Sequence, residues 1–135
     1  MTAIVWKNDY SVGVERFDNE HKKLIEIINR LNEAMSVGKS KEVMGSVITE
    51  LLKYTHTHFK NEEEYQKSIG YPDYENHLKI HKYFISKMVE FDNRFKTSNI
   101  GLGVDVMMFL RDWLIKHITV EDKKYGEYSK KPILK

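Results

Sequence analysis

Two pairs of metal-binding side chains occur at helical spacing near the middle of the chain. Glu62 follows His58 by four residues, and His81 follows His77 by four residues. On an α-helix this spacing places both members of a pair on one face, one turn apart. A histidine and a carboxylate so placed can bind one metal ion, and so can two histidines. The sequence therefore indicates a metal site whose ligands are carried by helices.

Further candidate ligands lie on the same inward faces. A single histidine on an apolar face is more often an ordinary core residue, but several such residues favour a shared function. His56 lies about 200° around the helix from His58, so we expect it to be exposed and not a ligand. Helical periodicity places the other five of the six histidines on apolar stripes: His21, His58, His77, His81 and His117.

A carboxylate also falls on one of these stripes. Glu62 ends the inward face of its helix, whereas Glu63 and Glu64 are predicted to be solvated. A buried carboxylate without a partner costs several kcal/mol, so a cation or strong hydrogen-bond donors must meet Glu62. The chain has no cysteine, which leaves nitrogen and oxygen as the ligand atoms for any metal.

Four helices are needed to position these residues. Asp18 and Ser40 are suitable N-caps, Gly38 is a suitable helix end, and Pro72 can occupy a first helical position. The inner face of the last helix is predicted to contain Val104, Met107, Leu110, Leu114 and His117. We predict an extended arm over residues 1–17 with Trp6 as its anchor, helices over 18–37, 40–69, 72–95 and 101–123, and an irregular tail over 124–135. The fold class is all-α, an up-down-up-down four-helix bundle.

Composition limits the class of protein. A length of 135 residues predicts one domain over 1–135, and 41% hydrophobic residues fit a globular core. The net charge of +2 with interspersed signs argues against a nucleic-acid surface. No apolar run approaches the roughly 20 residues of a membrane span. We expect a protein of the cytoplasm.

The motifs as a set resemble the hemerythrin family, specifically its single-domain bacteriohemerythrins. The resemblance covers nearly the whole chain, including the arm from Trp6 to Val14. The matching segments are Asp18-Asn-Glu-His21, His58-Phe-Lys-Asn-Glu62-Glu63, Gly70-Tyr-Pro72 with His77 and His81, and Trp113-Leu-Ile-Lys-His117-Ile with Asp122.

The resemblance implies an oxo- or hydroxo-bridged pair of iron ions and a role for each ligand. One iron would be bound by His77, His81 and His117. The other would be bound by His21 and His58, with one position open for a small ligand. Glu62 and Asp122 would each bridge the two ions. Leu114 would form part of the wall of the oxygen pocket, although an ordinary core role fits it equally well.

Two positions leave the geometry open. Asp122 lies five residues after His117, about 140° out of register on an ideal helix, whereas Glu121 lies four residues after it. Since the family pattern favours Asp122, we expect the helix to fray or bulge there. Gln66 stands where the family often has methionine, and it could face either the core or the solvent.

The resemblance implies reversible binding of dioxygen, for storage, transport or delivery to oxygen-using enzymes. A monomer that is not an enzyme is the expected form. The alternatives are a di-iron redox enzyme that handles peroxide or nitric oxide, an oxygen sensor, and a helical bundle without gas chemistry. The last alternative leaves the inward histidines unexplained.

Overall fold

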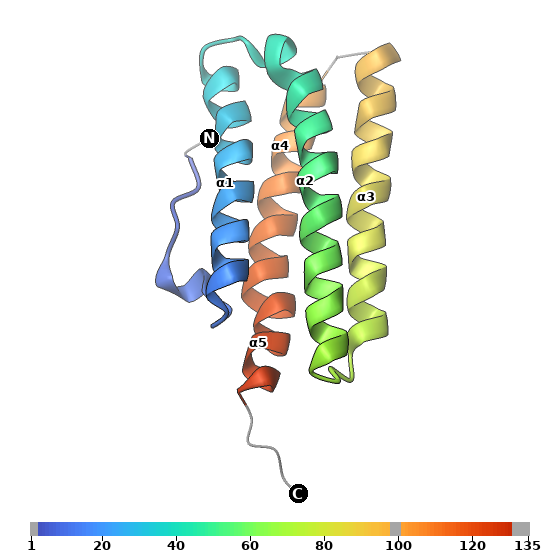
Figure 1. The fold of residues 1–135 in the computed structure, drawn as a ribbon. Coiled ribbons are helices and arrows are strands. Elements are labelled where there is room, and N and C mark those ends of the chain that lie inside the picture. Colours follow the sequence, from blue (N-terminus) through green and yellow to red (C-terminus); the bar gives the residue numbers. More distant parts are fainter. Residues whose placement is uncertain (1–2, 98–100, 131–135) are drawn as a thin grey trace, which may run out of the picture.

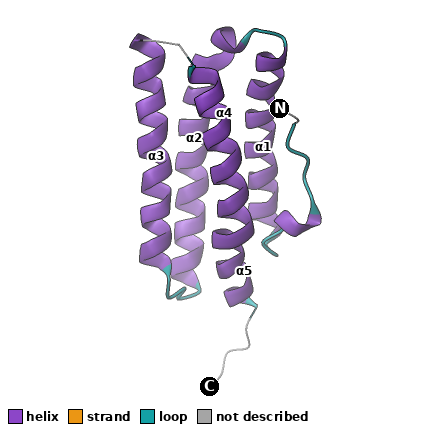
Figure 2. Cartoon of the chain, turned by 180° about the vertical axis from the view of Figure 1, so that it is seen from behind, coloured by secondary structure: helices purple, strands orange, loops and turns teal. Residues whose placement is uncertain are grey.

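The computed structural model describes residues 3–97 and 101–130, and it is a bundle of four long helices (Figure 1). Consecutive helices run in opposite directions, and α1 and α3 each pack against both α2 and α4. No strand occurs among the described residues, as the view from behind also shows (Figure 2). The helices are α1 (Glu15–Ser36), α2 (Ser40–Ser68), α3 (Tyr74–Thr97), α4 (Leu102–Lys116) and α5 (Lys123–Ser129), with a π-helical segment (His117–Asp122) between the last two. The predicted all-α up-down-up-down bundle is confirmed.

Helix α2 begins at the predicted residue and α4 one residue late, whereas α1 and α3 begin two or more residues from the predicted positions. α1 begins three residues early, because the carbonyl of Val14 already accepts hydrogen bonds from the amides of Phe17 and Asp18. Asp18 is therefore not an N-cap. Pro72 does not open α3 either, because a turn closed by Tyr74 N–H and Tyr71 C=O separates it from the helix.

The arm lies along α1, and its fastening differs from the prediction (Figure 1). Trp6 is only half-buried, whereas Ile4 and Val12 are buried in the core. The backbone of Ile4 exchanges two hydrogen bonds of 2.8 Å with the side chain of Asn29. The carboxylate of Asp18 accepts a hydrogen bond of 2.8 Å from the amide of Val12. Backbone hydrogen bonds and the buried side chains of Ile4 and Val12 hold the arm, and the half-buried Trp6 packs against the edge of the core.

The C-terminal segment is more regular than predicted. Residues 124–129 continue as helix α5, and only residues 131–135 of the predicted tail lie outside the described residues. Gly126 faces the arm so closely that a Cβ there would lie 1.8 Å from the carbonyl oxygen of Val12. The absence of a side chain at Gly126 therefore lets α5 pack against the arm and keep its buried residues in place.

The two ends of the bundle have different interiors. The end at which α1 begins and α2 ends, hereafter the ligand end, contains the buried histidines and carboxylates. The opposite end, hereafter the apolar end, is filled by aliphatic, methionine and aromatic side chains: Leu31, Met44, Val47, Met88, Phe91, Leu102, Val106 and Met107. Val104 was predicted to face this core, but it is 49% exposed, because the inward stripe of α4 passes through Val106 and Met107 instead. Among the described residues, no helix is long and apolar enough to cross a membrane.

Candidate metal centre

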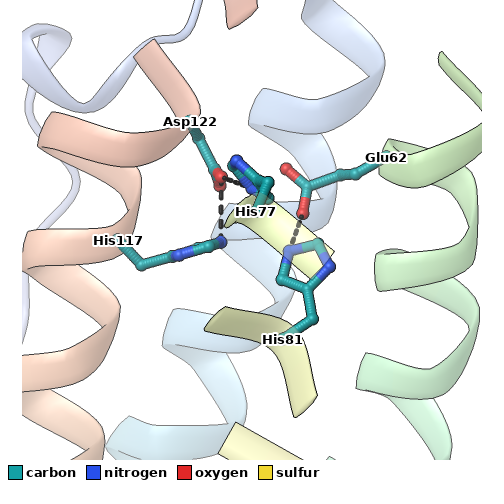
Figure 3. A group of neighbouring side chains, drawn as sticks. All are labelled: Glu62, His77, His81, His117 and Asp122. Carbon is teal, nitrogen blue, oxygen red and sulfur yellow. Dashed lines mark ion pairs between the residues drawn. The ribbon is translucent and has the colours of Figure 1, made fainter. Parts of the chain in front are cut away.

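Seven buried polar side chains from all four sides of the bundle converge at the ligand end, and Figure 3 shows five of them. Each is at most 3% exposed. α1 contributes His21, α2 contributes His58 and Glu62, α3 contributes His77 and His81, and the π-helical segment contributes His117 and Asp122. These are the seven residues that sequence analysis singled out, and the fold brings all of them together.

The seven residues form two groups that share both carboxylates. The first group contains three histidines with Glu62 and Asp122, and the second contains two histidines with the same two carboxylates. Within each group one ligand atom per residue can be chosen so that all lie within 4.8 Å of one another. The first group has His77, His81 and His117, and the second has His21 and His58. Two neighbouring ions could therefore share Glu62 and Asp122.

The two oxygens of Asp122 face different groups of histidines. Oδ1 lies 2.9 Å from Nε2 of His77 and 2.8 Å from Nε2 of His117 (Figure 3). Oδ2 lies 2.9 Å from Nε2 of His21. One carboxylate thus presents one oxygen to each group, which is the arrangement that a bridging ligand needs.

Glu62 is shared in a similar way, although less evenly. Its Oε1 lies 3.2 Å from Nε2 of His58 and 3.3 Å from Nε2 of His81. Its Oε2 lies 3.6 Å from Nε2 of His21. Glu62 therefore touches histidines of both groups.

A π-helical turn brings Asp122 into line with His117. The segment His117–Asp122 widens the helix, so that a residue five positions along falls on the same face. The expected bulge is confirmed. Glu121, the simpler choice on an ideal helix, belongs to neither ligand group and lies 3.6 Å from the ammonium of Lys124.

Two further glutamates position the histidines from outside. Nδ1 of His58 lies 2.5 Å from Oε1 of Glu20, and Nδ1 of His81 lies 2.9 Å from Oε2 of Glu63. A carboxylate on Nδ1 fixes the tautomer and ring orientation and strengthens Nε2 as a metal ligand. Glu63 was predicted to be solvated, and this was wrong, because its side chain turns back to His81 across the α2–α3 interface.

Tyr125 holds Glu62 in place from α5. Its hydroxyl donates a hydrogen bond of 2.6 Å to Oε2 of Glu62, and its ring is fully buried. Burial and the nearby charges of Glu62 and Asp122 raise the pKa of Tyr125 well above its ordinary value, so the phenol remains a donor. Sequence analysis missed Tyr125 because it placed this residue in an irregular tail.

The electrostatics of the centre favour anionic carboxylates. Burial alone would raise the pKa of Glu62, but the neighbouring imidazoles of His58, His21 and His81 bring it well below its usual range. Burial opposes protonation of His21, yet Asp122 and Glu62 raise the pKa of this imidazole to about 10. In the chain without metal, protonated imidazole thus supplies positive charge beside the two buried carboxylates.

The unsatisfied polar atoms at the centre fit metal ions better than hydrogen bonds. Nε2 of all five histidines and both oxygens of Asp122 are buried and lack a partner with hydrogen-bond geometry among the described residues. Such atoms are normally paired, so a set of them aimed at common points indicates bound cations. Imidazole nitrogen and carboxylate oxygen are ligands that iron accepts in proteins. The donor set therefore fits a pair of iron ions.

The structure also places three other residues that sequence analysis singled out. Gln66 is fully buried, so it faces the core, and neither atom of its amide has a hydrogen-bond partner among the described residues. His56 is exposed, as predicted. Leu114 is 2% exposed and borders a small apolar cavity of about 10 Å³.

Comparison with known proteins identifies the family. A family model described as the hemerythrin HHE cation binding domain matches residues 12–128. The chain belongs to the hemerythrin family. A bacteriohemerythrin of Pseudomonas aeruginosa (strain LESB58) is 36% identical over 125 residues, which are 93% of this chain and 80% of that protein. A myohemerythrin of Theromyzon tessulatum is 30% identical over 120 residues, 89% of this chain and 88% of that protein.

Solved hemerythrin structures share the fold. The crystal structure of a wild-type hemerythrin is 26% identical and superimposes with a TM-score of 0.85, over 96% of this chain and all of that chain. The four-helix bundle described above is thus the hemerythrin fold.

Proposed function

We propose that this hemerythrin binds dioxygen reversibly at a pair of iron ions held in the ligand end. The observation that carries the proposal is the unequal division of the ligands: two groups share Glu62 and Asp122, but one has three histidines and the other has two. A pair of ions so held has one member with a protein ligand fewer than its neighbour. That member offers a position to a small external ligand.

The assignment of residues follows from the two groups. His77, His81 and His117 would hold one ion, His21 and His58 would hold the other, and Glu62 and Asp122 would bridge them. The open position would then lie on the side of His21 and His58. Glu20 and Glu63 would orient one histidine of each ion through Nδ1.

The ligand set favours reversible binding over oxidation of a substrate. Di-iron sites that are rich in carboxylates use about four glutamates and two histidines on similar bundles. Here five imidazoles, which would be neutral as metal ligands, accompany two carboxylates. Less negative charge at the site would favour the ferrous state of bound iron, and the chemistry that such a pair would supply is reversible electron donation to dioxygen.

The protein around the open side keeps water away. The small apolar cavity is lined by Leu24, Thr55 and Leu114, which lie three residues from His21, His58 and His117 respectively, together with Ile28, Leu51, Phe84, Leu110 and Trp113. The hydroxyl of Thr55 is already occupied, because it donates a hydrogen bond of 2.6 Å to the carbonyl of Leu51. A cavity without free polar groups does not hold water firmly. We assign Leu114 as a wall of the oxygen pocket on this basis.

The proposed role is storage, transport or delivery of dioxygen to oxygen-using enzymes, and not catalysis. One chain supplies every ligand of the site, so a monomer suffices for binding. We propose that this monomer works in the cytoplasm, as the sequence suggests.

An optical cycle tests the proposal. The iron-loaded protein is reduced without air, exposed to oxygen, and then returned to an oxygen-free atmosphere. A carrier shows a visible band that appears with oxygen and disappears when oxygen is removed. Irreversible oxidation in the first exposure, with turnover of an added peroxide or nitric oxide, would instead indicate an enzyme.

A further inference from the structure

A groove between α2 and α3 reaches the proposed metal centre from the surface. Its volume is about 340 Å³, and its floor is apolar, formed by Phe59, Leu78 and Ile85. The remaining lining residues are polar: His56, Lys60, Glu63, His81 and Lys82. His81 is the member of this set that also belongs to the ligand group around Glu62 and Asp122.

The imidazole of His81 connects the groove with the centre. Its Nε2 lies 3.3 Å from Oε1 of Glu62, whereas its Nδ1 lies 2.9 Å from Glu63, which lines the groove. One face of the ring stacks on Phe59, with 3.9 Å between ring centroids and 7° between planes. A molecule seated in the groove on Phe59 and Glu63 would therefore also contact His81, a proposed metal ligand.

Two lysines of the groove lining, Lys60 and Lys82, are exposed, and further exposed lysines lie along the same two helices. Lys53, Lys60 and Lys67 follow one another at intervals of seven residues, so they form one exposed line along α2. Lys79 and Lys82 are exposed on α3. Among the described residues none of these five lysines is in an ion pair, whereas Lys23 and Arg30 of α1 are paired with glutamates. Glu63, the only acidic residue of the groove lining, is already engaged by His81.

We propose that this groove, hereafter the α2–α3 groove, is the docking site of an acidic one-electron carrier protein that returns the oxidised iron pair to the ferrous state. The inference rests on the proposed function, because an iron pair that binds dioxygen must be ferrous and so needs reduction after oxidation. Each carrier molecule loses one electron at the groove. Two successive encounters supply the two electrons that convert both ferric ions to ferrous ions, and two oxidised carriers leave.

The shape and charge of the groove favour a protein carrier over other acidic partners. Transient redox complexes use small interfaces, and charges around them steer the encounter. An apolar floor beside a metal ligand suits such a complex. Nucleic acid or an anionic membrane would use the lysines but would have no use for contact with His81. The groove between α3 and α4 is less suitable, because one lysine and one glutamate, Lys116 and Glu121, balance its charge.

Charge reversal tests the proposal on the full iron-loaded protein. The oxidised protein is mixed anaerobically with reduced flavodoxin, an acidic carrier, and reduction of the iron is followed by stopped flow at low and high ionic strength. The test variant is Lys60→Glu with Lys82→Glu. The matched control is Lys39→Glu with Lys41→Glu, which makes the same change of net charge at exposed residues of the apolar end. A neutral small reductant, the deazariboflavin radical, measures reduction that needs no docking.

The expected result is a reduction by flavodoxin at least about tenfold slower in the test variant at low ionic strength, with the difference lost in high salt. The control variant and the reaction with the neutral reductant should remain unchanged. Equal slowing in both variants, or no slowing in either, would overturn the docking site. So would lysine-dependent binding to vesicles of anionic lipid with an unchanged flavodoxin rate. The reversible oxygen band is also measured in the test variant. If that band is intact, a negative result counts against the docking site and not against the proposed function.

Discussion

The apolar end and the ligand end of this bundle use the same four helices for opposite purposes. At the apolar end, buried side chains such as Leu31, Val47 and Met107 contribute stability through burial alone. At the ligand end, five imidazoles and two carboxylates occupy equivalent inward positions. Burial of these groups opposes folding unless a partner satisfies them. The comparison shows that stability and chemistry are separated along the bundle axis.

Among the changes that separate the two ends, loss of a shared carboxylate should have the largest effect, and it should lower the iron content of the ligand end. In Glu62→Ala both ions lose a ligand at once, so we expect most of the iron to be absent from the purified protein. Glu64→Ala, an exposed glutamate two residues away, is the matched control and should retain its iron. Iron per chain is measured by atomic emission. Full iron content in Glu62→Ala would remove Glu62 from the site.

Loss of one histidine should lower the iron content less than loss of a bridging carboxylate. His77→Ala removes a ligand of one ion only, and we expect iron content to fall to about half or less. His56→Ala should leave it unchanged, because His56 is exposed on the outer side of α2. Equal losses in the two variants would contradict the division into inward and outward histidines.

A truncation at the apolar end should lower stability without affecting the metal. Leu31 is fully buried, so Leu31→Ala should lower the free energy of unfolding by roughly 2–5 kcal/mol. Its iron content, measured well below the melting temperature, should match that of the unmodified protein. Urea unfolding gives the first quantity. Proportional losses of stability and iron would show that the two ends are not separable.

The free energy of unfolding of the metal-free protein should depend on pH through the charged groups of the ligand end. The pKa of Glu62 is lowered from 4.5, so its contribution is present above that value and is lost as pH falls through the lowered pKa. The pKa of His21 is raised from 6.5 to about 10, so its contribution is present below 6.5 and is lost as pH rises through about 10. Unfolding in urea with a chelator should therefore show greatest stability between about 4.5 and 6.5. A metal-free stability that still increases toward pH 10 would contradict these pairings.

The parts of this molecule that sequence predicts are those that depend on local periodicity. The inward faces of His58 and Glu62, or of His77 and His81, follow from the spacing along one helix. The inward position of Asp122 does not follow from helical spacing alone, because it depends on a π-helical turn that an ideal α-helix does not contain. Family resemblance, and not spacing, distinguished it from Glu121.

The residues that sequence analysis missed have their partners on other elements. Glu20 of α1 meets His58 of α2, and Glu63 of α2 meets His81 of α3. Tyr125 reaches Glu62 only because α5 continues the bundle beneath the arm. The helix periodicity of a single sequence does not show such contacts between elements, so these outer partners became visible only in the fold.

Anomalous diffraction from crystals of the iron-loaded protein soaked with azide tests the central claim most directly. The account predicts two iron peaks per chain that share Glu62 and Asp122, with azide bound on the ion held by His21 and His58. A single peak, or azide on the ion held by His77, His81 and His117, would contradict it.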